Sequence, residues 1–361
     1  MNACAGCVRL GDRLLSRSAH DQFTETLRCW FEDGEWKEEQ DLLYDPVIPA
    51  DMRNGQLVTP VYENCGPALS RADLFFSWST PTCSLPQFSP TAMCHAMRGR
   101  TLMFVGDSLT IAHWETTLQA MAHGRPSMMG SGRHNGCVSQ SDGPAMLSWH
   151  IAHTYDFCAE LGALPFNVSY TCHNHILSGY FPATTPEILD YNRTWRAHRD
   201  HLRALDSGPG LVLVVNRGAW VREDIDVAAG MYSMMRFVRE DLPKTLFVFR
   251  SSNMAHRGCR EYSTPRARGE PLLEPSGGAN EPPTWRWSFF PGQARRIVKP
   301  IVEDNRFVAR GVVLDVLPAM QLRPDAHTDD CLHYCIPGPI DQWVRWVFAI
   351  IVEVDRLGVQ V

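Results

Sequence analysis

Residues 101–109 of the chain read TLMFVGDSL, an apolar run of strand length that breaks at Gly-Asp-Ser. The segment that follows reads as a helix, so this stretch predicts a strand-to-helix turn with Ser108 at its corner. A serine there is exposed at the C-terminal edge of a sheet, where the N–H groups of a helix start can stabilise an oxyanion. The same tripeptide also forms ordinary turns with an N-capping serine, so Ser108 is a candidate nucleophile that needs partners.

A second apolar run, from Leu211 to Val215, has the pattern of a buried strand and ends at Asn216. Open α/β sheets build their sites at the C-terminal ends of their strands. We therefore expect the Asn216 amide to lie near Ser108.

An acid and a histidine, Asp330 and His333, lie three residues apart in a segment that also holds Cys331 and Cys335. On a helical turn these two side chains would share a face, so Asp330 could hold one ring nitrogen of His333 and leave the other free as a base. Asp325 and His327 form a second pair of this kind nearby.

Apolar strand patterns alternate with helical ones along the chain, which predicts an α/β fold. The expected strands are residues 101–105, 211–215, 245–250 and 311–316, and the expected helices follow Ser108 and cover residues 225–242, 292–304 and 340–357. The last helix carries an apolar stripe that we expect to face the core. Residues 260–283 are rich in proline, glycine and charge and are expected to form a long surface loop.

The composition narrows the class of protein. The 361 residues carry a formal charge of −6 without a basic run, which argues against nucleic acid as the partner. Twelve cysteines are many for a cytosolic enzyme, and their spacings do not make a zinc site. The sequons at Asn167 and Asn192 fit a protein of the secretory pathway. Residues 1–17 hold no apolar stretch long enough for a signal peptide or a membrane anchor, and we expect a truncated N-terminus.

This order of motifs resembles the SGNH, or GDSL-type, hydrolase superfamily: a serine follows the first strand, an asparagine follows a middle strand, and Asp-x-x-His comes further on. Within it, the chain resembles the PC-esterase and plant trichome-birefringence-like family of polysaccharide O-acetyltransferases. The resemblance runs from about Cys29 to about Trp346. It is carried by blocks that occur in a shared order: Cys29-Trp30, Gly34-Glu35-Trp36, Trp78, Cys83 to Phe88, Leu102 to Leu109, Trp114-Glu115, Asn216-x-Gly218-x-Trp220, Phe249-Arg250-Ser251, His256, Arg323 to His327, and Asp330 to Trp343.

The resemblance implies an SGNH-like three-layer sandwich with a mostly parallel sheet and a disulfide-tied N-terminal lobe. Residues 1–28 would form a tail without fixed structure, residues 29–98 a family-specific region packed on the catalytic domain, and residues 99–357 that domain. It also implies disulfides that join Cys29 to Cys83, Cys65 to Cys335, and Cys259 to Cys331. The pairing of Cys94, Cys137, Cys158 and Cys172 stays open.

For the site, the resemblance implies a catalytic triad of Ser108, His333 and Asp330. The oxyanion would be held by the backbone N–H of Ser108, the Asn216 amide and Gly179. The residues expected to bind substrate or shape its pocket are Asp107, His113, Arg250, His256, Arg323, Asp325 and His327. No metal or resident cofactor is expected, and an acetyl donor such as acetyl-CoA would be a co-substrate.

The implied function is transfer of an acetyl group to a hydroxyl of a polysaccharide or glycan. The alternatives are an esterase that uses the same triad, and a catalytically inactive glycan-binding protein. Family members are generally Golgi proteins with a membrane anchor, so a Golgi or secretory location is expected, with membrane contact only through an anchor that this chain lacks. Ile111 and Ala112 replace an Arg and an Asn of plant members, and we expect a redirected acceptor preference, with His113 as a partial substitute.

Overall fold

The computed structural model describes residues 7–11, 13–39, 65, 71–121, 150–172, 199–216, 224–270, 290–303 and 311–357. Its centre is a six-stranded sheet with the order β10-β9-β8-β5-β7-β6. All neighbouring strands are parallel except β6, which runs antiparallel to β7. The strands are β5 Thr101–Gly106, β6 His150–Tyr155, β7 Phe166–Cys172, β8 Leu211–Val215, β9 Leu246–Arg250 and β10 Val312–Leu314.

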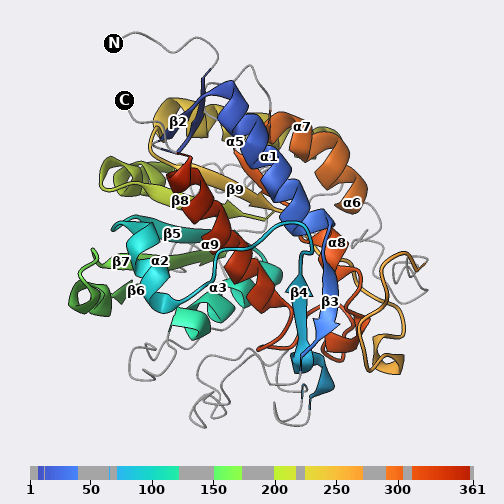
Figure 1. The fold of residues 1–361 in the computed structure, drawn as a ribbon. Helices are drawn as coiled ribbons and strands as arrows, with labels where there is room; N and C mark the ends of the chain where they lie inside the picture. The colour runs from blue at the N-terminus through green and yellow to red at the C-terminus, as the bar shows by residue number, and fades with distance from the viewer. Residues whose placement is uncertain are drawn as a thin grey trace, which may run out of the picture.

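Helices cover both faces of this sheet, which gives the expected three-layer α/β sandwich. Successive residues of a strand point to opposite faces, and β5 shows the result. Leu102 and Phe104 join the core under α2, α3 and α9, while Met103 and Val105 join the core under α5 and α7. Figure 1 shows α9 (red) and α1 (blue) side by side in front of the sheet. The helices are α1 Arg17–Glu32, α2 Pro90–Met97, α3 Ser108–Met121, α5 Asp224–Asp241, α6 Phe290–Gln293, α7 Lys299–Val302, α8 Leu317–Met320 and α9 Ile340–Arg356.

Where the structure describes residues 7–28, they do not form the tail that was predicted. β1 (Val8–Leu10) pairs with β2 (Arg13–Leu15), and α1 begins at Arg17. α1 is amphipathic and buries Phe23, Leu27, Trp30 and Phe31 in the same core as α9. The ring of Phe31 lies 5.3 Å from that of Trp346. The boundary at residue 29 was wrong because the matched motifs begin in the middle of this helix.

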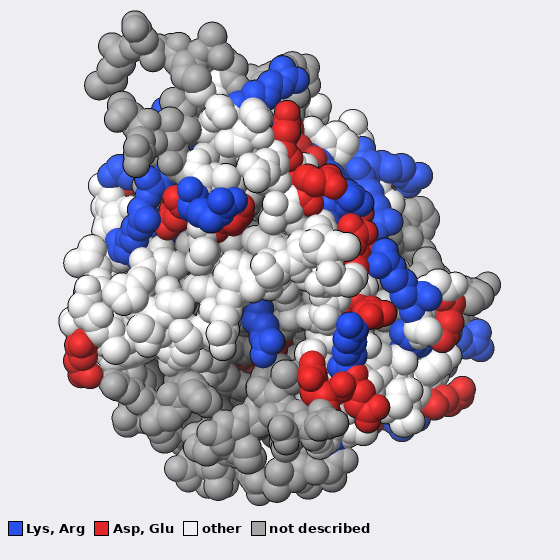
Figure 2. Space-filling model, in the orientation of Figure 1, with Lys and Arg blue, Asp and Glu red and all other residues white. Residues whose placement is uncertain are grey.

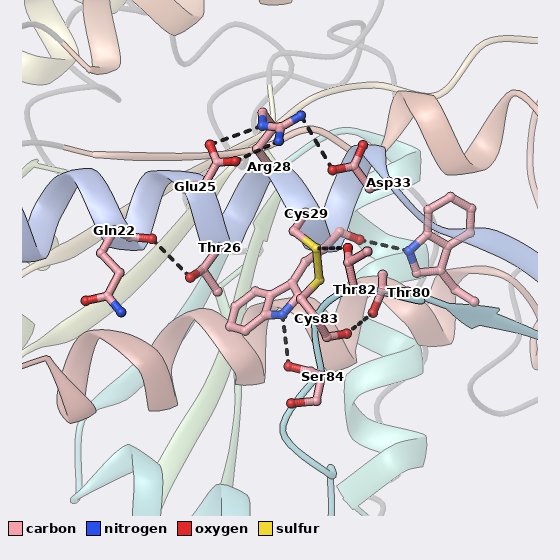
Figure 3. The surroundings of a disulfide bond; sticks show 12 residues. Gln22, Glu25, Thr26, Arg28, Cys29, Asp33, Thr80, Thr82, Cys83 and Ser84 are labelled. Carbon is pink, nitrogen blue, oxygen red and sulfur yellow. Dashed lines mark hydrogen bonds and ion pairs between the residues drawn. A yellow bond between two sulfur atoms is a disulfide. The ribbon is translucent and has the colours of Figure 1, made fainter.

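A second small sheet, β3 (Glu35–Glu38) with β4 (Phe76–Ser79), follows α1. Figure 3 shows how the Cys29–Cys83 disulfide ties α1 to the segment after β4. Two tryptophan hydrogen bonds run in parallel with it: Trp30 Nε1 donates to the Ser84 backbone oxygen at 3.1 Å, and Trp78 Nε1 donates to the Trp30 backbone oxygen at 2.8 Å.

The strands predicted at residues 101–105, 211–215, 245–250 and 311–316 are all present with small shifts at their ends. The helix predicted at residues 292–304 exists as α6 and α7 joined by a π-helical turn at Ala294–Val298. The apolar stripe of α9 is buried, as predicted. The described part of the predicted loop, residues 260–270, begins within a short 3₁₀ turn at Cys259–Glu261, and residues 271–283 lie outside the described residues.

On the face shown in Figure 2, basic and acidic side chains are interspersed. None of the described helices combines the length and the apolar character needed to span a membrane.

Candidate active site

Ser108 is the first residue of α3, and only Asp107 separates it from the end of β5. Between Thr101 and Leu118 every residue except Ser108 is buried. The turn needs a glycine at position 106, since a Cβ there would collide with Thr110 Oγ1 and lie 3.0 Å from the backbone oxygen of Asn216. The turn therefore exposes one hydroxyl at the C-terminal edge of the sheet, as the sequence predicted.

Asp107 organises the start of α3 rather than facing a substrate. Its Oδ1 accepts the Leu109 backbone N–H at 3.1 Å, and the side chain is buried. The backbone N–H of Ser108 itself finds no acceptor in the described part of the chain. A free N–H at the positive end of a helix is suited to hold a developing oxyanion.

The structure brings Ser108, His333 and Asp330 together in the arrangement of a catalytic triad. His333 Nε2 lies 2.8 Å from Ser108 Oγ, and His333 Nδ1 lies 2.5 Å from Asp330 Oδ2. A carboxylate can only accept, so it fixes the proton on Nδ1 and leaves Nε2 to accept the serine proton. Burial raises the pKa of Asp330, but the hydrogen bond and charge of His333 outweigh it, and the pKa is lowered. Asp330 is thus held as the ionised partner that the triad needs.

The segment that carries Asp330 and His333 is a tight loop, so the prediction of a helical turn was wrong. A bridge between His327 and Tyr334 closes the base of this loop. At its tip Asp330 Oδ1 accepts hydrogen bonds from Thr328 Oγ1 at 2.7 Å, Leu332 N at 2.9 Å and His333 N at 3.0 Å. One carboxylate oxygen therefore shapes the loop while the other orients the histidine.

The loop between His327 and Tyr334 carries the candidate acid and base, and we call it the catalytic loop. Residues 253–259 fasten it to the rest of the domain. Asn253 Nδ2 donates to the Leu332 backbone oxygen at 2.9 Å, and the His256 backbone N–H donates to the Cys331 oxygen at 2.9 Å. The Cys259–Cys331 disulfide adds a covalent link two residues before His333. Cys331 has a left-handed backbone with φ 59°, a conformation that a bulky residue adopts at a cost.

The three predicted disulfides are present: Cys29–Cys83, Cys65–Cys335 and Cys259–Cys331. The structure also joins Cys94 to Cys158, a pair that the sequence left open. Cys137 lies outside the described residues. Two of these bonds end in the segment around His333, so the covalent network converges on the catalytic loop.

Asn216 follows β8 and is fully buried, but its amide is occupied. Its Nδ2 donates to the Arg250 backbone oxygen at 3.0 Å and to Ser252 Oγ at 3.0 Å. The first acceptor is a carbonyl, so the amide cannot be turned round to free these hydrogens. Donation to an oxyanion stays a prediction that requires exchange of one of these bonds. Gly179 lies outside the described residues.

Arg250 and His113 do not line a substrate pocket, contrary to the expectation for them. Arg250 is fully buried, its Nη2 donates to Thr110 Oγ1 at 3.0 Å, and its guanidinium lies 4.5 Å from the Trp343 ring. Burial lowers the pKa of Arg250 to about 10. His113 is equally buried, between the rings of Phe104 and Trp343. Burial, and then the charge of Arg250, hold the pKa of His113 well below its usual value. Both side chains support the first turns of α3.

Arg323 and Asp325 also face each other rather than a substrate. Arg323 Nε and Nη2 each lie 3.0 Å from a different oxygen of Asp325, and both side chains are almost completely buried. Burial raises the pKa of Asp325, and the Arg323 charge partly offsets the rise. Arg323 Nη2 also donates to the Asp73 backbone oxygen, and the guanidinium stacks 4.4 Å from the Trp36 ring. The pair thus joins the catalytic loop region to the β3–β4 sheet.

His256 and His327 bond to each other instead of to a substrate or an acid. His256 Nδ1 lies 2.6 Å from His327 Nε2. His327 Nδ1 faces the backbone oxygen of His333 at 3.0 Å. Asp325 is engaged with Arg323, so Asp325 and His327 do not form a second catalytic pair.

The residues after the nucleophile are core positions. Ile111 is 5% exposed and Ala112 is fully buried, and both belong to the core beneath α9. Their burial gives no direct contact with an acceptor, and the expectation that they redirect the acceptor preference stays a prediction. An Arg at position 111 would place a charge in this apolar core.

Three residues that support the site were not predicted from the sequence: Thr110, Thr328 and Asn253. Thr328 lies only two residues before Asp330, so its hydroxyl could have been considered from the sequence as a local partner of that carboxylate. Thr110 and Asn253 act across large sequence separations and have no such signal. Among the described residues, no group of three or more His, Cys, Asp or Glu side chains could hold a metal ion.

The comparisons with known proteins cover most of the chain. The family described as "PC-Esterase: GDSL/SGNH-like Acyl-Esterase family found in Pmr5 and Cas1p" matches residues 85–225 and 221–350. Protein trichome birefringence-like 38 of Arabidopsis thaliana is 26% identical over 296 residues, which cover 76% of this chain and 72% of that protein. Protein trichome birefringence-like 39 of the same plant is 25% identical over 88% of this chain and 85% of its own length. Xyloglucan O-acetyltransferase 3 of Populus trichocarpa is 24% identical over 87% of this chain and 86% of its own length.

Proposed function

Because the chain belongs to the PC-Esterase family of GDSL/SGNH-like acyl-esterases, we propose that it is an O-acetyltransferase that acetylates a hydroxyl of a polysaccharide or glycan. The observation that carries the proposal is the hydrogen-bonded order Ser108, His333, Asp330, with Ser108 as the one unburied residue of its strand and helix start. Relatives named as xyloglucan and xylan O-acetyltransferases support the class of acceptor.

In the first step, His333 Nε2 takes the proton of Ser108 as Oγ attacks the acetyl carbonyl of a donor. The carbonyl π electrons move to its oxygen, which the Ser108 N–H stabilises at the start of α3, with Asn216 and Gly179 as further candidate donors. The intermediate collapses, the donor's leaving group departs with the proton from His333, and acetyl-Ser108 remains.

In the second step, a hydroxyl of the acceptor gives its proton to His333 Nε2 and attacks the acetyl carbon of acetyl-Ser108. Collapse breaks the bond to Oγ, and His333 returns the proton to Ser108. Asp330 stabilises the imidazolium in both steps without taking its proton. The Asp330 side chain is 42% exposed, so the triad lies near the surface, within reach of a polymer.

The alternative is an esterase, in which water replaces the acceptor in the second step. The triad serves both reactions, so the distinction lies in what attacks acetyl-Ser108. An inactive glycan-binding protein is the least favoured function because it would not need a nucleophile, a base and an acid in hydrogen-bonding order.

The decisive experiment incubates the purified protein with a radiolabelled acetyl donor, acetyl-CoA or an acetylated glycan, with and without a panel of polysaccharides. Label that appears on a polysaccharide, and is lost with Ser108→Ala, supports the transferase. Release of free acetate at the same rate with and without acceptor would contradict the transferase and support the esterase. A location in the secretory pathway is part of the proposal, supported by the disulfides.

A further inference from the structure

Two histidines outside the triad, His256 and His327, form a chain of three contacts that ends on the catalytic loop. His256 Nε2 lies 3.1 Å from the backbone oxygen of Gln321, and His256 Nδ1 lies 2.6 Å from His327 Nε2. His327 Nδ1 lies 3.0 Å from the backbone oxygen of His333. His256 is fully buried, and the His327 ring stacks on Tyr334 with centroids 4.1 Å apart, so both rings are held in place.

These three contacts require three protons. A carbonyl oxygen can only accept, so each of the two outer contacts needs a proton on its ring nitrogen. The contact between the rings needs one more proton, on either nitrogen. Two neutral imidazoles carry two protons, so a neutral pair leaves one contact with two lone pairs facing each other. A pair with one added proton satisfies all three.

The surroundings decide which contact lacks its proton in the neutral pair. The backbone oxygen of His333 already accepts the Thr328 N–H at 2.8 Å. The backbone oxygen of Gln321 has no other donor among the described residues, so it keeps the His256 Nε2 proton. His327 then donates from Nε2 to His256 Nδ1, and its Nδ1 lone pair faces the oxygen of His333.

We propose that His327, supported by His256, is a positioning residue for the catalytic loop, and that the pair holds the backbone oxygen of His333 fully only after it binds one proton. The proposal rests on the proposed role of His333 as the base. The proton adds at His327 Nδ1 and forms the third hydrogen bond, with the charge shared between the two rings. The loop is therefore held by one more bond at acid pH than at neutral pH.

The charged groups that face the pair are Arg266, Asp330 and the triad histidine itself. Burial, and then Arg266, lower the pKa of His256 to about 4, while its contact with the Gln321 oxygen opposes this. Burial and the neighbouring His256 lower the pKa of His327, and Asp330 opposes this. Proton uptake by the pair is therefore expected below pH 6.5, the usual value for histidine.

Substitutions at position 327 separate this role from simple packing. In His327→Asn the amide Nδ2 can take the place of Nδ1–H and donate to the His333 oxygen at every pH, whereas His327→Leu has no donor. We expect His327→Asn to exceed the wild-type turnover of an acetyl ester about two- to tenfold at pH 7.5, the range that one hydrogen bond allows. The turnover of His327→Asn and that of the wild type should converge as the pH falls toward 4. His95→Asn on the exposed face of α2 is the matched control and should follow wild type throughout.

Nitrogen NMR of protein labelled with ¹⁵N-histidine tests the proton count without relying on activity. We expect one proton taken up by the His256–His327 pair between pH 7.5 and 4, with Nδ1 of His327 changing from unprotonated to protonated. An Nδ1 that is already protonated at pH 7.5, or no uptake in the folded protein, would overturn the proposal. A ratio of His327→Asn to wild-type turnover that does not change with pH would overturn it as well. Wild-type protein without any acyl transfer would instead contradict the proposed function and leave the NMR result standing.

Discussion

Replacement of Asp330 by asparagine should abolish catalysis while keeping the catalytic loop. In the native loop Asp330 Oδ1 accepts three hydrogen bonds, from Thr328, Leu332 and His333, and Oδ2 faces His333 Nδ1. Only an oxygen can accept from three donors, so the introduced amide must place its oxygen where Oδ1 lies and its NH₂ where Oδ2 lies. The NH₂ then donates to His333 Nδ1, which fixes the ring proton on Nε2.

A proton on Nε2 points at Ser108 Oγ, 2.8 Å away, so the ring can no longer accept the serine proton. A triad histidine in the wrong tautomer loses about 10³- to 10⁴-fold in turnover, equivalent to about 4–5 kcal/mol of activation free energy. The thermal unfolding midpoint should change little, because the three bonds that shape the loop remain.

The assay is single-turnover release of the leaving group from an acetyl ester. The matched control is Asp329→Asn, the same substitution at the neighbouring residue, whose side chain is 53% exposed and pairs with Arg260. The control should keep wild-type activity. If Asp330→Asn retains more than a tenth of wild-type turnover, Asp330 does not act by fixing the tautomer of His333.

Two further predictions concern stability. A double alanine variant that removes the Cys259–Cys331 disulfide opens a 72-residue loop, which should lower the unfolding free energy by about 4 kcal/mol in the chain-entropy model. The variant that still folds should also lose most of its activity. The Cys94–Cys158 double alanine variant opens a 64-residue loop, and neither of its cysteines lies in the loop that carries Asp330 and His333. It should lose similar stability in guanidinium titrations but keep its turnover, and equal activity losses for the two variants would refute the special role of the Cys259–Cys331 bond. Because the folded pKa of His256 is lowered to about 4, the unfolded chain binds more protons between pH 6.5 and 4, and stability falls as the pH falls through that window. His256→Gln should remove up to about 3 kcal/mol of this pH dependence. An unchanged pH profile of unfolding would contradict the lowered pKa of His256.

The sequence predicted the central strands and the triad because both are encoded locally or in short motifs. The strand of residues 101–106 is an unbroken apolar run, and its turn is dictated by Gly106 and the start of a helix. β6 and β7 were missed because their apolar residues are mixed with polar ones such as His150 and Asn167.

The roles of the polar residues around the triad could not be read from the sequence. Arg250 and His256 occur in motif blocks beside the site, and residue type alone does not distinguish a side chain that touches substrate from one that supports the loop. Burial decides this, and burial depends on packing between elements far apart in the chain. Both proved to be fully buried and bonded within the protein. The motif blocks therefore identified the framework of the site more reliably than its substrate-binding surface.

The intact mass of the protein, measured after rapid mixing with an acetyl donor and quenching in acid, shows directly whether an acetyl-enzyme forms. We expect the mass increase of one acetyl group, located on Ser108 by peptide mapping, absent in Ser108→Ala and strongly reduced in Asp330→Asn. Acetyl transfer to a glycan that continues undiminished in Ser108→Ala would contradict the role of Ser108 as the nucleophile.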